Sequence, residues 1–184
     1  GIARRQGDRV EMRVHPTLIP EQKQLANVDG VLNAIMIKGD AVGELVLVGP
    51  GAGGTATASA VCADLADIAR TAAGSGPALG VPMGQLKSQT MVPADDIESE
   101  WYVRLAASDC AGVMSDITQV LANHDVSIES LLQNPPREDQ TTVSIVLLTQ
   151  VASASVMTAV MQEITALTEV EKEFTLLRVE AFDQ

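Results

Sequence analysis

Residues 101–132 read WYVRLAASDCAGVMSDITQVLANHDVSIESLL, and this stretch decides the fold of the second half of the chain. Apolar residues alternate with others over 103–107, which predicts a strand, because side chains of a strand point alternately to its two faces. After a turn at 108–112, apolar residues recur every three or four positions over 113–124, which predicts a helix. Alternation returns at 126–132 and predicts a second strand.

The residues that follow complete a repeating order of strands and helices. Alternation over 143–147 predicts a third strand, helical spacing of apolar residues over 156–167 predicts a second helix, and 174–182 predicts a fourth strand. The order β-α-β-β-α-β is the ferredoxin-like arrangement, in which a four-stranded antiparallel sheet carries two helices on one face. The other face of such a sheet needs a cover, commonly a second copy.

The first part of the chain predicts a strand, a hairpin and a helix. Residues 9–14 alternate as a strand does, and 31–37 and 42–48 form two strands of a hairpin around a Lys-Gly-Asp turn. A glycine-rich turn at 49–54 follows, and a helix begins after it. The expected helix cap is Thr55 or Thr57, and the apolar stripe of the helix consists of Val61, Leu65, Ile68 and Ala69.

These patterns predict an α+β protein. A partial mixed α/β segment occupies 1–73, a linker or surface loop rich in Gly and Pro occupies 74–100, and a βαββαβ domain occupies 101–184. Every aromatic residue lies beyond position 100. A core of small aliphatic side chains over about 70 residues would be thin, because small domains bury a low fraction of their surface. We therefore expect the first segment to complete a sheet or core supplied by another segment or chain.

Charge and cysteine content narrow the class of protein. The net charge is −12, and residues 101–184 hold four basic against twelve acidic residues. Acidic surfaces repel phosphate groups, so we expect neither nucleic acid nor an anionic membrane as a partner. Cys62 and Cys110 have no metal-ligand spacing, so we expect two buried thiols in a reducing compartment and no metal site. No long apolar run or leader pattern is present, and a cytoplasmic location is expected.

Two stretches resemble known families. RVHPTLIP (13–20) and LANVDGVLNAIMIKGDAVGELVLVGPGAGGTATASAVCADLADIAR (25–70) resemble the C-terminal half of the catalytic region of homoserine dehydrogenase. Residues 101–184, with SDCAGVMSDITQVLANHDVSIESLLQ, resemble an ACT domain, a small amino-acid-sensing module. The resemblance implies an NAD(P)-dependent enzyme that interconverts homoserine and aspartate semialdehyde by hydride transfer, on the route to threonine and methionine. It also implies a feedback sensor, with threonine as the expected effector.

The resemblance also implies what the chain lacks. The family's nucleotide-binding Rossmann domain, its catalytic lysine and its substrate-holding acidic residues have no counterpart after Gly1, where the chain opens without methionine. We therefore expect no catalytic residue in this chain, no tight NAD(P) binding and no dehydrogenase activity from it alone. Two other interpretations stay open: a stand-alone amino-acid-binding module whose first segment serves only assembly, and a purely structural oligomerisation tail.

The glycine-rich turn is the candidate cofactor contact. Its spacing partly fits a dinucleotide fingerprint, but no surrounding βαβ unit is evident and the Lys-Ser/Thr of a phosphate-binding loop is missing. A tight turn without a ligand is the competing interpretation. The resemblance favours a turn that closes the nicotinamide end of the cleft, with Gly51 and Gly53 in contact with the cofactor. His15 is interpreted as a structural histidine rather than a general base.

The candidate effector site follows from the resemblance to ACT domains. It comprises a loop before a helix and a second strand that is often contributed by a partner chain. Amides at the helix start would bind the carboxylate of an amino acid, and Asp109 would bind its ammonium. Ala111 and Asp125 depart from the family pattern, and an ACT fold used only for association is the alternative. By position, the effector-binding residues are Asp109, Gly112, Val113, Met114, Ser127 and Ile128.

Overall fold

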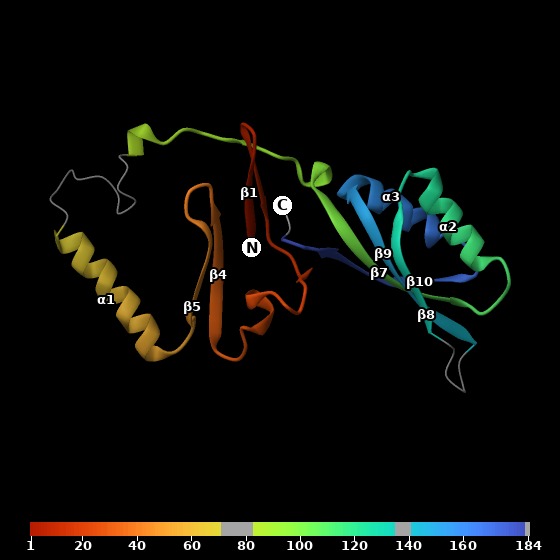
Figure 1. Ribbon diagram of the computed structural model, residues 1–184, viewed down its shortest axis with the longest axis horizontal. Coiled ribbons are helices and arrows are strands. Elements are labelled where there is room, and N and C mark those ends of the chain that lie inside the picture. Colours follow the sequence, from red (N-terminus) through yellow and green to blue (C-terminus); the bar gives the residue numbers. More distant parts are fainter. Residues whose placement is uncertain (71–82, 135–140, 183–184) are drawn as a thin grey trace. The chain divides into compact units, whose positions relative to one another are not determined.

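The computed structural model describes residues 1–70, 83–134 and 141–182 (Figure 1). Its contacts divide the chain into two compact units, one formed by Gly1–Ile19 with Gln89–Gln184 and the other by Pro20–Ser88. This grouping places the first 19 residues with the C-terminal half of the chain. The domain boundaries expected from the sequence, at 73 and 100, remain a prediction.

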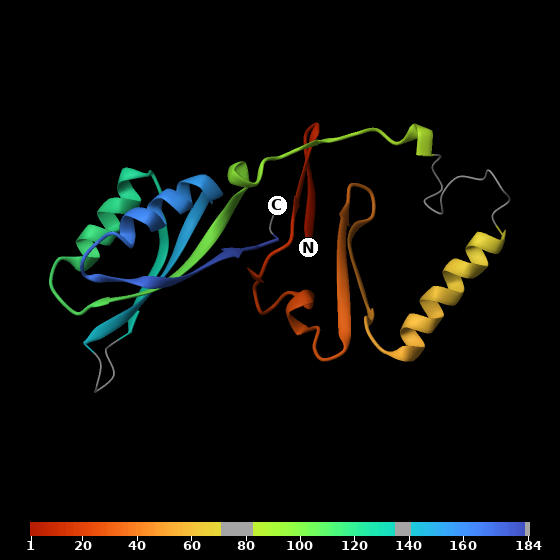
Figure 2. The same cartoon turned by 180° about the vertical axis from the view of Figure 1, so that it is seen from behind.

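The larger unit contains the predicted βαββαβ fold. Four strands lie in the order β10-β7-β9-β8, each antiparallel to its neighbour. Both helices lie on one face of this sheet (Figures 1 and 2). The α+β prediction for this part is therefore confirmed. The elements are β7 (Glu98–Ser108), α2 (Val113–Asn123), β8 (Ile128–Asn134), β9 (Thr142–Ser153), α3 (Ala154–Ile164) and β10 (Val170–Val179).

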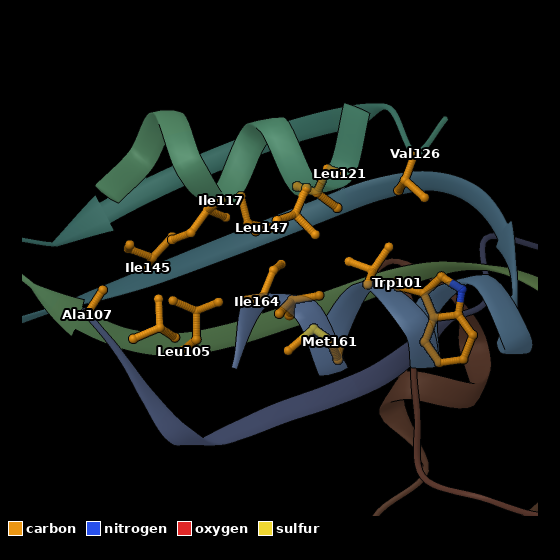
Figure 3. Packing of buried hydrophobic residues seen from close by; sticks show 14 of the residues in the cluster. Trp101, Leu105, Ala107, Ile117, Leu121, Val126, Ile145, Leu147, Met161 and Ile164 are labelled. Carbon is orange, nitrogen blue, oxygen red and sulfur yellow. The ribbon is translucent and has the colours of Figure 1, made fainter. Parts of the chain in front are cut away.

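The hydrophobic core lies between that sheet and its two helices (Figure 3). Every second residue of β7, and of β9 as far as Thr149, is buried, which is the alternation that the sequence shows. Trp101 closes one end of the core, and its indole N–H donates a 2.9 Å hydrogen bond to the carbonyl oxygen of Ala152. The buried helical side chains are Val113, Ile117, Val120 and Leu121 on α2, and Met157, Val160, Met161 and Ile164 on α3.

Short strands from the start of the chain extend the larger unit. β1 (Ile2–Gln6) and β2 (Arg9–Arg13) form an antiparallel pair, and β6 (Thr90–Met91) runs parallel to β2. β3 (Thr17–Leu18) adds a fifth strand to the main sheet, parallel to β10. The strand expected at 9–14 is confirmed, whereas the two-residue strands carry too little pattern to be predicted. Of the expected linker, 74–82 lies outside the described residues, and 89–100 contributes β6 and the start of β7.

The smaller unit contains the predicted hairpin and helix. β4 (Leu32–Gly39) pairs with β5 (Gly43–Pro50) in antiparallel register, and α1 covers Gly54–Arg70. Short 3-10 turns lie at Gln24–Asn27 and Met83–Gln85. The expected threonine cap was wrong. The helix begins at Gly54, directly after the turn made by Gly53, so both threonines lie within its first turn.

Hydrophobic side chains of the smaller unit are exposed or only partly covered. None is buried among the described residues 20–70 and 84–88. The apolar stripe of α1 is open to solvent, since Val61, Leu65 and Ile68 are 51%, 60% and 70% exposed. Such a stripe normally faces a core. A cover from outside the described residues is therefore needed, as the scarcity of large side chains in this segment suggests.

Three further observations on the described residues concern the cysteines, metal-ligating side chains and helices long enough to span a membrane. Cys62 and Cys110 are both exposed, so the prediction of buried thiols was wrong. Cys62 lies on α1, which has no buried face in this chain, and Cys110 lies in the surface turn after β7. No group of three or more metal-ligating side chains is found in the described part. No helix there is long and apolar enough to cross a membrane.

Candidate functional sites

The glycine-rich turn joins β5 to α1. The amide of Gly51 donates a 3.1 Å hydrogen bond to the carbonyl oxygen of Val31, which ties the turn to the start of β4. The amide of Thr57 donates to the carbonyl oxygen of Gly53 at 3.0 Å, so the helical bonding of α1 starts at the turn. The N–H groups of a helix that precede this first bond have no partners within the helix and attract anions.

Three glycines of this turn differ in how strongly their surroundings or their backbone conformation favour glycine. Gly53 has φ +118°, a conformation that side-chain-bearing residues rarely adopt. Gly51 has no such constraint, but a Cβ placed there would lie 1.3 Å from Nδ2 of Asn33. Gly49 meets neither constraint, since a Cβ there would face open space. The structure therefore places Gly53 where the backbone conformation requires glycine, and Gly51 where a side chain would have to displace that of Asn33.

The candidate effector loop lies between β7 and α2. Gly112 precedes the helix with φ +104°, so glycine is needed there for backbone conformation. Val113 is buried and Met114 is packed against the core. Their side chains therefore serve the fold, which leaves their backbone N–H groups as the atoms that could bind a ligand. Asp109 is exposed, and its amide donates a 3.2 Å hydrogen bond to the carbonyl oxygen of Thr141.

The other two predicted effector residues lie elsewhere on the same sheet. Ile128 pairs with Thr149 of β9, whereas Ser108, beside the loop, pairs with Thr142. Seven residues along a strand amount to roughly 23 Å. The structure therefore does not bring Ser127 and Ile128 to the loop within one chain. Only a second copy could supply them there, as the resemblance to ACT domains implies.

Asp125 takes the place where glycine is common and adopts the left-handed conformation, with φ +56°. The turn it makes is well bonded, because the amide of Val126 donates to the carbonyl oxygen of Leu121 at 2.9 Å. His124 ends α2, and its Nε2 lies 2.8 Å from Oε1 of Glu163 on α3. This contact joins the two helices at the surface. The turn therefore keeps a left-handed residue at this position, a conformation that Asp tolerates better than most residues with a side chain.

His15 contacts its own turn. Its Nδ1 lies 3.0 Å from both the carbonyl oxygen of Pro16 and the hydroxyl of Thr17. Its Nε2 is buried without a hydrogen-bond partner among the described residues. No carboxylate orients the ring in these contacts, so the geometry gives no support to a general-base role.

A buried group of charged residues, which we call the charge cluster, joins β2 to the end of β10. Arg13 is its centre: its guanidinium donates to the hydroxyl of Ser99 at 2.8 Å and to Oε2 of Glu180 at 2.9 Å. Its Nε lies 2.9 Å from Oε1 of Glu11 in an ion pair. Arg4, which lies on β1, forms a further ion pair with Glu180. The side chains of Glu11, Arg13 and Glu180 are at most 7% exposed.

A third arginine extends the charge cluster to the hydrophobic core. Arg178 on β10 donates to the hydroxyl of Ser99 at 3.0 Å and to the carbonyl oxygen of Ile97 at 3.2 Å. Its guanidinium carbon lies 4.3 Å from the centre of the Trp101 ring, a cation–π contact. Burial, and next the positive charge of Arg13, lower the pKa of Arg178. Sequence reasoning missed this cluster, because its members are far apart in the chain.

A hollow of about 460 Å³ opens beside the charge cluster. Gln6, Glu98 and Phe182 are among the residues that line it, and none of the predicted site residues does. Glu11 and Arg13 also line it, but they are already paired with each other. The paired charges of this hollow therefore serve the fold first.

Comparison with known proteins covers both parts of the chain. Residues 1–66 match the family model of homoserine dehydrogenase, and residues 100–172 match an ACT domain model. A homoserine dehydrogenase of Neisseria gonorrhoeae is 44% identical over 185 residues, covering 98% of this chain and 42% of that protein. One from Bacillus subtilis is 33% identical, with 98% and 41% covered. The crystal structure of a homoserine dehydrogenase from Thiobacillus denitrificans matches with a TM-score of 0.83 and 40% identity, covering 97% of this chain and 41% of that one.

Fold and similarity together define a dehydrogenase-family segment followed by a ferredoxin-like ACT domain. The chain spans about two fifths of the length of the curated relatives named above. It corresponds to the C-terminal part of homoserine dehydrogenases, and the resemblance seen in the sequence is confirmed.

Proposed function

We propose that this chain is the C-terminal part of an NAD(P)-dependent homoserine dehydrogenase, which interconverts homoserine and aspartate semialdehyde in threonine and methionine biosynthesis. The observation that carries the proposal is similarity along nearly the whole chain to the corresponding part of homoserine dehydrogenases. The uncovered apolar surface of the smaller unit supports it, because a segment of a larger catalytic core has such a surface.

In this proposal the glycine-rich turn forms one wall of the cofactor site. Gly51 and Gly53 approach the nicotinamide nucleotide, which supplies the hydride chemistry when bound. A Cβ at Gly53 or Gly54 would face open space, so a ligand can come close to the backbone there. The N-terminus of α1, a helix of 17 residues, favours negative charge at the same place. The catalytic lysine and substrate-holding carboxylates belong to the part of the family outside the matched segment, so this chain alone is inactive.

The ACT domain is proposed to sense an amino acid, with threonine as the expected effector. The amides that precede and start α2 would bind its carboxylate, and Asp109 would bind its ammonium. Because Ser127 and Ile128 lie far from this loop in one chain, the complete site would form between two copies. An effector that binds the inactive arrangement about tenfold better shifts the equilibrium by ~1.4 kcal/mol.

Self-association is proposed through two surfaces. One comprises the exposed apolar residues of β4, β5 and α1, and the other is the face of the ACT sheet opposite its helices. The acidic charge of the chain argues against nucleic acid and membranes as partners. A cytoplasmic location fits this biosynthetic role.

A second function is favoured by one observation: the larger unit has a complete core of its own, so it can serve as a stand-alone amino-acid-binding module. Titration calorimetry of the chain with threonine, isoleucine, methionine and lysine tests whether it binds an amino acid, which the sensor and the stand-alone module both require. Heat from threonine that is lost in Asp109→Asn supports the sensor. No heat and no thermal shift with any of the four leaves association as the role of the domain.

The dehydrogenase part of the proposal needs a separate test. The longer protein that carries this chain should reduce NAD(P) in the presence of homoserine. If it does not, while the chain still binds an amino acid, the stand-alone module is supported instead.

A further inference from the structure

Asn33 lies beside the glycine-rich turn on the neighbouring strand. In the hairpin it pairs across from Gly49, two residues before Gly51. Its side chain extends along the turn, so that a Cβ on Gly51 would lie 1.3 Å from its Nδ2, 2.3 Å from its Cγ and 3.1 Å from its Cβ. The amide side chain therefore occupies the space that a side chain at position 51 would otherwise fill.

This packing restricts the backbone of Gly51, which as a glycine could otherwise adopt many conformations. Glycine has the widest range of backbone conformations, so a turn that contains it needs support from its surroundings. Gly51 receives two supports from residues at and just before the start of β4: the carbonyl oxygen of Val31 accepts its N–H, and the side chain of Asn33 lies against its Cα side. Gly53, two residues later, then starts the helix.

We propose that Asn33 is a positioning residue of the nucleotide site: it holds Gly51 in the conformation that receives the cofactor. This inference rests on the proposed function of the turn. Asn33 acts through Gly51, so it should affect nucleotide binding more than the chemical step. Reaction sites tolerate little displacement of the groups that position a ligand.

The test uses the longer dehydrogenase that carries this chain, because the smaller unit is uncovered in the chain alone. Three variants are compared with the unmodified enzyme. Asn33→Ala removes the atoms that pack on Gly51, and Asn33→Leu restores a branched side chain of similar size. Glu44→Ala is the control, because Glu44 is an exposed polar residue at the far end of the same hairpin, opposite Lys38 and outside the apolar surface.

Two readouts separate the positioning role of Asn33 from the role of the glycine-rich turn in binding the cofactor. Hydrogen exchange of a peptide covering 48–55 reports whether the turn opens, and the KM for the nucleotide reports binding. We expect Asn33→Ala to speed exchange and to raise the nucleotide KM, each about fivefold, with kcat and the homoserine KM unchanged. Asn33→Leu should recover most of both effects, and Glu44→Ala should change neither.

Exchange that is unchanged in Asn33→Ala overturns the positioning role, whether or not the protein is a dehydrogenase. Faster exchange with an unchanged nucleotide KM overturns the assignment of this turn to the cofactor. If the unmodified longer protein does not oxidise homoserine at all, the proposed function fails. The exchange readout still decides whether Asn33 holds the turn.

Discussion

Replacement of Glu180 by Gln tests the charge cluster most directly. Glu180 follows β10 directly, is 5% exposed, and accepts hydrogen bonds or ion pairs from Arg13 and Arg4. Its backbone amide also donates to the carbonyl oxygen of Leu18 at 2.9 Å, which continues the contact between β3 and β10. The substitution removes the charge and directs an amide N–H group toward two arginines.

The magnitude follows from burial. Breaking a buried ion pair by removing one partner costs about 3–5 kcal/mol, because the remaining charge is left without compensation. Here the cost should be lower, since Arg13 keeps its ion pair with Glu11 and the side chain of Arg4 is 43% exposed. We expect a loss of roughly 2–3 kcal/mol in the free energy of unfolding of the larger unit.

The assay is urea unfolding followed by the fluorescence of Trp101, the only tryptophan in the chain and a residue of the buried core. Glu173→Gln is the matched control, because Glu173 lies on β10, the strand that Glu180 follows, is exposed, and loses the same charge. The control should change stability by less than about 0.5 kcal/mol. Equal unfolding midpoints for the two variants would refute the argument that the cluster stabilises this unit.

Three further results are expected. Gly51→Ala should raise the nucleotide KM of the longer dehydrogenase more than tenfold, while Gly49→Ala leaves it unchanged. Adding Asn33→Ala to Gly51→Ala should recover part of the loss, because the Cβ of residue 33 would then be the nearest atom to the new Cβ, at 3.1 Å. Asp125→Gly should stabilise the larger unit by about 0.5–1 kcal/mol, measured as a higher urea midpoint, because it removes a left-handed residue that carries a side chain; a lower midpoint would contradict this. Ile164→Ala should destabilise it by about 2–5 kcal/mol in the same assay, since Ile164 is fully buried, and a loss below about 1 kcal/mol would show that the helix is not part of the core.

The fold of the larger unit could be predicted because each of its strands and helices is indicated by an apolar pattern within that one element. Apolar residues at Val103, Leu105 and Ala107 alternate within a few positions, and all three are buried in the structure. The same holds for the stripes of α2 and α3, whose spacing places buried side chains on one side of each helix. A pattern that repeats within one element can be recognised without knowledge of its neighbours.

The charge cluster could not be predicted, because it depends on contacts between distant residues. Arg13 is 86 positions from Ser99 and 167 positions from Glu180 in the chain. Nothing near Arg13 distinguishes it from the exposed arginines of the same strand pair. The role of β3 was hidden for a similar reason, since two residues show no period.

The glycine-rich turn was predicted in part. Its glycines indicate a tight strand-to-helix turn, but the sequence does not say which of them is needed for conformation and which for space. The structure separates Gly53, with its positive φ, from Gly51, where Asn33 fills the space of a side chain. That distinction requires the register of the hairpin, which becomes known only when the strands are paired.

The central claim is that this chain holds a wall of the cofactor site and an amino-acid sensor but not the groups that move protons. The direct measurement is the appearance of reduced nicotinamide nucleotide when purified residues 1–184 are mixed with homoserine and oxidised nucleotide. The account predicts no change in absorbance above the rate without homoserine. A steady, homoserine-dependent rise from this chain alone would contradict it.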